Sequence, residues 1–233
     1  MSVKDKGEDA TTRRDRAVAR VLDPARERAE TRVQRFLDAA LELMRTSSGA
    51  DFSVQEVVEK SGQSLRSFYQ YFDGKYELLL ALLEDSTRST ADSLEKMVQD
   101  ESTPMARLRR FSVEYYAMCR PIASAKANGK YRPSVALGEF AQQLLTEHPA
   151  EASRAFIPLV TLLERLIEGA VKSGEITDSV PVRRIAGLFL QAIMFSTFGL
   201  TIAGELDESA GGGDAAEELW GVLLHGFTST GDK

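Results

Sequence analysis

The chain has 233 residues, of which 43% are hydrophobic and 27% charged, and it carries a net charge of -6. This composition is typical of a globular protein with enough length to bury a core, and it excludes a chain that is disordered throughout. The acidic balance argues against a protein that coats nucleic acid indiscriminately. The single cysteine, Cys119, excludes an intramolecular disulfide and a multi-cysteine metal site. The N-terminus has no apolar stretch of the signal-peptide kind, so we expect a cytoplasmic protein.

Positive charge is concentrated near the N-terminus. Residues 1–80 hold fourteen Lys and Arg and fourteen Asp and Glu, so the rest of the chain carries the whole net negative charge. Between Arg13 and Arg35, eight arginines are set against four acidic residues. Residues 1–27 are charged and poor in large apolar groups, and we interpret them as a flexible basic arm.

Apolar residues recur at helical spacing along almost all of the remaining chain, which predicts an all-α protein of about nine helices. The first helix is expected from about Arg28 to Ser47. The second opens with Ser53 and Glu56, a capping-box pair, and stops at Ser61-Gly62. The third is capped by Ser64 and ends near Phe72. Two short helices joined by a glycine turn behind a supporting helix make a helix-turn-helix pattern.

The third predicted helix has an aromatic face and a polar face. Spacing alone places Leu65, Phe68, Tyr69 and Phe72 on one buried stripe. The polar face carries Arg66, which is suited to a bidentate contact with guanine, an amide suited to adenine and hydroxyls suited to phosphate. On helix chemistry alone, a solvated surface is an equally open interpretation.

The fourth to ninth helices are expected at about 73–99, from Pro104 through 116, at 135–146, at 150–172 with Pro158 kinking or dividing it, from Pro181, and at 215–227. Residues 186–204 contain no charge and are long enough to span a membrane. Two small polar residues at the centre, Ser196 and Thr197, and an acidic stretch afterwards favour instead a buried helix between two subunits.

The stretch FSVQEVVEKSGQSLRSFYQYFDGKYELLLALLE, with its upstream helix, resembles the DNA-binding domain of the TetR family of bacterial transcriptional regulators. The run from Ser67 to Lys75 is similar to the signature of that family's third helix, and the likeness covers about residues 28–80. It implies that Phe68 and Phe72 are core, and it moves Leu65 and Tyr69 from the core to the interface. The DNA-binding residues implied by the resemblance and the helix pattern are Arg28, Ser53, Gln55, Ser64, Leu65, Arg66, Ser67, Tyr69, Gln70, Tyr71 and Lys75.

The resemblance also implies a domain organisation: a basic arm at 1–27, a helix-turn-helix domain at 28–80 and a ligand-binding and dimerisation domain at 81–233. Soft and aromatic residues of the middle helices are the expected ligand pocket: Met105, Phe111, Tyr115, Met118, Phe140, Leu144, Phe156, Leu163, Met194 and Phe198. The last two helices are the expected dimer interface, through Phe189, Ile193, Leu219, Trp220, Leu223, Leu224 and Phe227. We expect no cofactor and no metal.

The resulting interpretation is a homodimeric regulator, most simply a repressor, that a small lipophilic or aromatic effector releases from a palindromic double-stranded DNA operator. There are two alternatives: an activator, and a helical protein-interaction module of the same fold without DNA binding. The arm could contact DNA or be simple solvated charge. An enzyme is not expected, because His148 and His225 are the only histidines and no metal-binding or nucleophile motif occurs.

Overall fold

The computed structural model of the chain describes residues 13–46, 51–119, 133–176, 180–203 and 212–227. Within these ranges every regular element is a helix, which confirms the predicted all-α class. The ten helices are α1 (Arg13–Thr46), α2 (Val54–Ser61), α3 (Leu65–Phe68), α4 (Lys75–Gln99), α5 (Pro104–Cys119), α7 (Pro133–Glu147), α8 (Pro149–Ala155), α9 (Ile157–Lys172), α10 (Val182–Ala203) and α11 (Gly212–Phe227).

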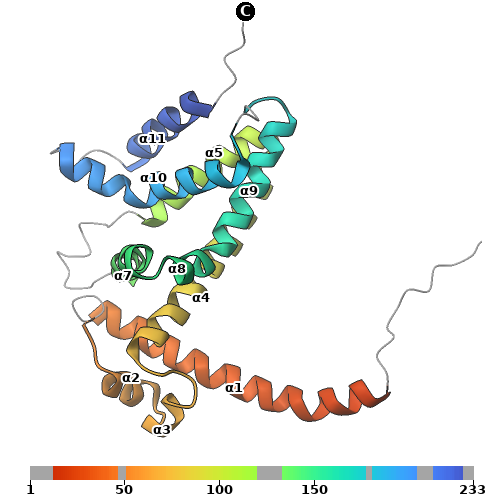
Figure 1. Cartoon of the computed structure of the whole chain (residues 1–233), viewed down its shortest axis with the longest axis vertical. Coiled ribbons are helices and arrows are strands. Elements are labelled where there is room, and N and C mark those ends of the chain that lie inside the picture. The colour runs from red at the N-terminus through yellow and green to blue at the C-terminus, as the bar shows by residue number, and fades with distance from the viewer. Residues whose placement is uncertain (1–12, 47–50, 120–132, 177–179, 204–211, 228–233) are drawn as a thin grey trace, which may run out of the picture.

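The helices form an N-terminal unit and a larger C-terminal bundle, joined by α4 (Figure 1). Helices α1, α2 and α3 lie together at one end of the molecule, and α4 leads from them into the bundle. There α4 packs on α5 and α9, α10 packs on α9 and α5, and α11 packs on α5. Helices α7 and α8 lie between the two parts, since both contact α4 and α7 also contacts α1.

The helix-turn-helix forms through local hydrogen bonds that the sequence encodes. The predicted capping box of α2 is present: the Glu56 N–H donates to Ser53 Oγ at 3.2 Å, and the Ser53 N–H donates to Glu56 Oε2 at 2.7 Å. Gly62 ends α2 with a φ of 66°, which is the left-handed conformation that glycine adopts without steric cost. Ser64 caps α3 as predicted, but α3 ends at Phe68 rather than near Phe72, because residues 69–71 form turns.

Three phenylalanine rings hold α3 against α1. Phe36 of α1 meets Phe68 at 5.4 Å and Phe72 at 6.1 Å between ring centroids, both edge to face, and all three side chains are buried. A four-residue helix has no stability of its own, so these contacts fix its position.

The prediction of a flexible arm is wrong for residues 13–27, which belong to α1. Their low hydrophobicity suggested disorder, yet Arg, Ala, Glu and Leu are all strong helix formers, and pairs four residues apart support the helix. Arg26 and Glu30 form such an ion pair at 2.7 Å. Residues 1–12 lie outside the described residues. Figure 1 shows the N-terminal part of α1 projecting away from the other helices.

The long predicted helix at 150–172 is divided into α8 and α9, as Pro158 suggested. The break at Phe156 brings the carbonyl of Ala155 within reach of α4, where the buried Thr87 Oγ1 donates to it at 2.6 Å. Among the described helices, α10 included, none is long and apolar enough to cross a membrane.

Candidate nucleic-acid interface

Helix α3 presents a mixed apolar and polar surface to solvent. Leu65 is 43% exposed and Tyr69 56% exposed, whereas Phe68, between them, is fully buried. The simple buried stripe is therefore wrong for Leu65 and Tyr69, and the interpretation taken from the family resemblance places them correctly on the surface. Arg66 and Gln70 are exposed as well, so α3 and the turn that follows it together expose a guanidinium, an amide, a phenol and an aliphatic group.

A shallow groove of about 320 Å³ borders this face and is lined by Arg32, Gln63, Ser64, Arg66, Ser67 and Gln70. Gln63 joins the two helices that form it, since its Nε2 donates to the Arg32 carbonyl at 2.9 Å. The sequence-based list missed Arg32. Its position one turn after Arg28, on the same side of α1, was the signal that could have found it.

The other predicted DNA-binding residues differ in whether their side-chain hydrogen-bonding groups are already used within the chain. The Ser53 hydroxyl already donates its proton to Glu56 at 2.8 Å, while Ser64 Oγ accepts from the Ser67 N–H at 3.1 Å and keeps its own proton. Gln55 is exposed and donates to Glu59 at 3.0 Å.

Two further residues of that prediction are partly enclosed. The Lys75 ammonium lies 4.6 Å from the centre of the Phe52 ring, a cation–π contact. Tyr71 is half-buried and packs against the core of the domain, which leaves it less surface for a base edge than Arg66 or Gln70 has.

A single tyrosine connects the first turn of α4 to the C-terminal bundle. The Tyr76 hydroxyl donates to Glu151 Oε2 at 2.5 Å, and its ring lies 5.8 Å from Phe140 and 5.3 Å from His148, measured between ring centroids. Partial burial, this hydrogen bond and the nearby carboxylates of Glu151 and Glu147 raise the pKa of Tyr76 from 10.0 to about 12. The start of α4 is thus tied to α7 and α8 by one side chain.

We expect this tie to depend on pH. Because the folded-state pKa of Tyr76 is raised, its stabilising contribution is complete below pH 10 and is lost as the pH rises through about 12. Burial also raises the pKa of Tyr115 well above 10.0, so an alkaline titration of phenolate absorbance should show one late-ionising tyrosine fewer in Tyr76→Phe than in the unmodified chain. A Tyr76→Phe titration identical to that of the unmodified chain would contradict the assignment.

The residues predicted as a ligand pocket are packed into one core. Phe111, Tyr115, Phe140, Leu144, Phe156 and Leu163 are buried, and Met105, Met118 and Met194 are half-buried against the same core. The side chain of Phe198 lies outside those the structure describes. Phe140 contacts Tyr76 at the junction of the two parts rather than the middle of the bundle. The pocket stays a prediction.

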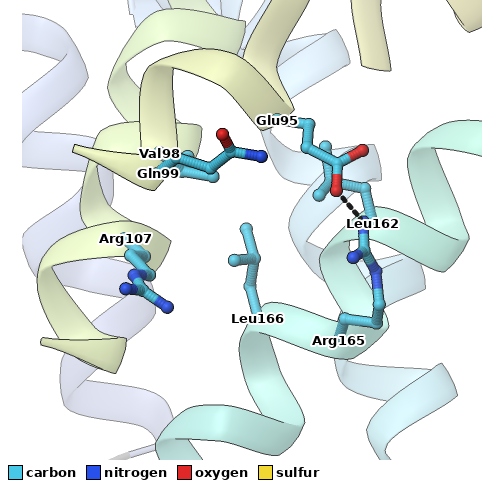
Figure 2. Close-up of a pocket in the computed structure, with 7 residues that line it drawn as sticks. All are labelled: Glu95, Val98, Gln99, Arg107, Leu162, Arg165 and Leu166. Atoms are coloured by element: carbon cyan, nitrogen blue, oxygen red, sulfur yellow. Dashed lines mark hydrogen bonds and ion pairs between the residues drawn. The ribbon is translucent and has the colours of Figure 1, made fainter. Parts of the chain in front are cut away.

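The C-terminal half shows instead a groove of about 310 Å³ between α4, α5 and α9, lined by Glu95, Val98, Gln99, Arg107, Leu162, Arg165 and Leu166 (Figure 2). None of these residues was predicted. One wall is closed by the Arg165–Glu95 ion pair at 2.8 Å. Among the described residues, no three His, Cys, Asp or Glu side chains are grouped as metal ligands.

The predicted dimer interface needs a correction. Phe189 and Ile193 of α10 and Trp220 of α11 are buried within the protomer, because α10 packs on α9 and α5 and α11 packs on α5, so they have almost no surface left for a partner. Leu219, Leu223 and Leu224 are half-buried against the same core, and the side chain of Phe227 is not among those described. Among the described side chains of these helices, the large apolar ones that are exposed are Leu188, at 45%, and Val222, at 72%.

The N-terminal unit matches a known family. The family model for bacterial regulatory proteins, tetR family, matches residues 36–82, which run from the second half of α1 through α2 and α3 into α4. No curated protein matches the chain.

Solved structures share the fold over most of the chain. The transcriptional regulator FadR from Bacillus subtilis, in complex with stearoyl-CoA, is 15% identical with a TM-score of 0.62, covering 83% of this chain and 98% of that one. The regulatory protein TetR from Rhodobacter sphaeroides is 20% identical with a TM-score of 0.56, covering 84% and 98%. SmeT, the repressor of the Stenotrophomonas maltophilia multidrug efflux pump SmeDEF, is 16% identical with a TM-score of 0.56, covering 85% and 91%. At these identities the likeness is one of fold.

Proposed function

This chain belongs, through its N-terminal unit, to the tetR family of bacterial regulatory proteins, and we propose that it is a homodimeric repressor that a small effector releases from a palindromic operator. The observation that carries the proposal is the surface of α3. The buried rings of Phe68 and Phe72 anchor the helix in the core, while Leu65, Arg66 and Gln70 are exposed to solvent. We assign residues 28–80 to operator binding and residues 81–233 to regulation, with the boundary inside α4.

The chemistry of the exposed face suits a major groove. Arg66 can donate two hydrogen bonds to the O6 and N7 of guanine, Gln70 can pair with adenine, and Leu65 can contact a thymine methyl group. The hydroxyls of Ser64 and Tyr69 can bond phosphate oxygens and so fix the helix on the duplex without reading sequence.

Dimerisation would follow from the exposed apolar residues of α10 and α11. Leu188 and Val222 lie on helices at the far end of the bundle from α3. A two-fold interface there would set two α3 helices about 34–36 Å, or a multiple of this distance, apart on the DNA, which is the spacing that a palindromic operator requires.

We propose a lipophilic effector, because the middle helices are rich in soft and aromatic side chains and because two proteins of this fold are described with stearoyl-CoA and as a repressor of a multidrug efflux pump. An effector acts only if its affinity differs between the bound and released conformations. Tyr76, in the first turn of α4, is the contact nearest to α3 through which we propose that a shift of α7 and α8 reaches α4.

Selection of bound sequences from random duplex DNA tests this proposal. The unmodified chain should select a palindrome, and Arg66→Ala should select the same palindrome with one relaxed position per half-site, at a cost of about 1–3 kcal/mol in binding free energy. Gln143→Ala, on the exposed side of α7, is a control that removes an amide outside the N-terminal unit. A chain that enriches no motif at moderate salt would overturn the operator-binding proposal.

A further inference from the structure

We propose that the part of α1 that precedes the matched family domain, residues 13–32, lies along the phosphate backbone of the duplex beside each half-site and so lengthens the DNA footprint. The inference rests on the proposed function, since it presupposes that α3 faces DNA. It concerns a segment outside the residues that match the family model, which begin at Phe36.

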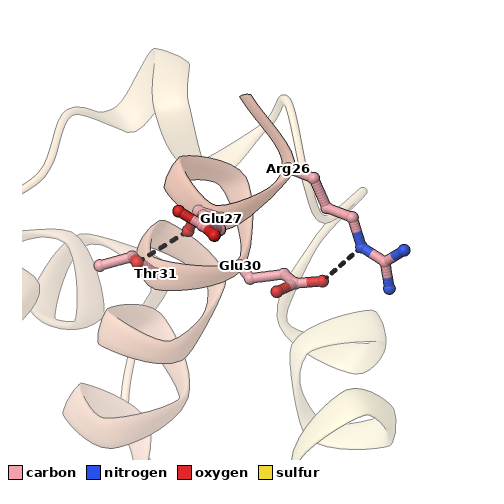
Figure 3. A network of polar contacts seen from close by, with 4 residues as sticks. All are labelled: Arg26, Glu27, Glu30 and Thr31. Atoms are coloured by element: carbon pink, nitrogen blue, oxygen red, sulfur yellow. Dashed lines mark hydrogen bonds and ion pairs between the residues drawn. The ribbon is translucent and has the colours of Figure 1, made fainter. Parts of the chain in front are cut away.

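This segment is helical along its whole length, with Pro24 inside it, and it has internal contacts of its own. Arg26 Nε donates to Glu30 Oε1 at 2.7 Å and Thr31 Oγ1 donates to the Glu27 carbonyl at 2.7 Å (Figure 3). From Arg13 to Arg32 it extends about 29 Å at 1.5 Å per residue. A helix about 10–12 Å wide does not fit a minor groove of about 6 Å, and the proposed function assigns the major groove of each half-site to α3, so contact with the phosphates is the geometry that remains for this segment.

The position of Arg32 places the segment at the edge of the DNA-facing surface. Arg32 lines the same groove as Arg66 and Gln70, and the Gln63 amide holds its carbonyl there. Arg28 precedes Arg32 by four residues and therefore lies on the same side of α1. Arg26 lies on a different side, where Glu30 neutralises it.

Charge indicates what the segment would bind. Residues 13–21 contain four arginines and one aspartate in a chain whose net charge is -6. Arg28 and Arg32 are exposed and form no ion pair with any described residue. Leu22 is the one large apolar side chain exposed between residues 22 and 32, too little for an apolar protein partner. An array of phosphates is the partner that fits the exposed guanidinium groups of Arg28 and Arg32.

The test compares operator duplexes that end at the half-sites with duplexes that continue for about ten base pairs on each side, roughly the length of the helix at 3.4 Å per step. Three full-length proteins are titrated over a range of salt concentrations: the unmodified chain, Arg28→Gln with Arg32→Gln, and Arg26→Gln. The last is the matched control, with the same residue type and the same helix but another face. Equal thermal midpoints establish that the variants fold.

The unmodified chain and Arg26→Gln should bind the longer duplex several-fold more tightly. The double variant should lose this advantage, and its slope of log affinity against log salt should fall by about 2. If flanking DNA changes nothing while Arg66→Ala still weakens operator binding, the inference is wrong and the proposed function stands. If the double variant instead lowers the oligomer mass in sedimentation, the segment is a protein interface and the inference is overturned. If no protein binds any duplex, both proposals fail.

Discussion

Replacing Phe68 with alanine is expected to destabilise the N-terminal unit by about 3–5 kcal/mol, the usual cost of deleting a buried phenylalanine side chain. The ring is fully buried, and it packs edge to face on Phe36 at 5.4 Å and lies 5.4 Å from Phe72. Because α3 has only four residues, the cavity cannot be closed by a small shift of a stable helix. Operator binding should disappear together with the structure of the unit.

Chemical denaturation followed by circular dichroism measures this loss, and Tyr69→Ala is the matched control. Tyr69 is the next aromatic residue in the chain and is 56% exposed, so its removal should cost only about 0.5–1.5 kcal/mol, the usual worth of an edge-to-face contact such as the one it makes with Phe68 at 5.5 Å, while still weakening DNA binding. A Phe68→Ala variant as stable as Tyr69→Ala would show that α3 is held by something other than the phenylalanine cluster.

The second large effect is expected from Leu188→Glu combined with Val222→Glu. In a two-fold interface, carboxylates at these exposed positions would be buried without a partner. The free-energy cost of burying these charges far exceeds the free energy that the interface gains by burying apolar surface. A monomer would bind each half-site separately and lose the effective concentration that a dimer supplies, so operator affinity should fall by about 10²–10⁴.

Sedimentation should show half the mass for this double variant, and Ile157→Glu is the control. Ile157 is also an exposed apolar residue, at the start of α9, so it receives the same substitution outside the proposed interface. If the double variant keeps the mass of the unmodified protein, the interface uses other surfaces.

Local chemistry made parts of this fold predictable. The Ser53–Glu56 capping box and the Ser64 cap follow from residues a few positions apart, and both were read correctly from sequence. Whether Leu65 and Tyr69 point inward could not be decided by spacing, because α3 ends after one turn and its helical period does not continue. The family resemblance, and not the helical period, indicated that both side chains lie on the surface.

Features that depend on distant partners were out of reach. Phe189 and Ile193, in the uncharged stretch of α10, and Trp220, in α11, look like interface residues in the sequence, but only the packing of these helices against α9 and α5 shows that they are already covered. The spacing from Arg28 pointed to Arg32, but no local pattern indicates the bond from Gln63, 31 residues away, that holds its carbonyl beside the proposed recognition surface. The N-terminal part of α1 was missed because poor hydrophobicity was taken as a sign of disorder.

The separation of anchoring and exposed side chains at α3 has an evolutionary consequence. The side chains that anchor it, Phe68 and Phe72, are different from those it exposes, Leu65, Arg66 and Gln70. Exposed substitutions away from caps and buried networks change stability by only about ±0.5 kcal/mol. New operator sequences can therefore be acquired by mutation at the exposed positions while the scaffold stays intact, so regulators that share this framework can diverge in their targets without first being stabilised.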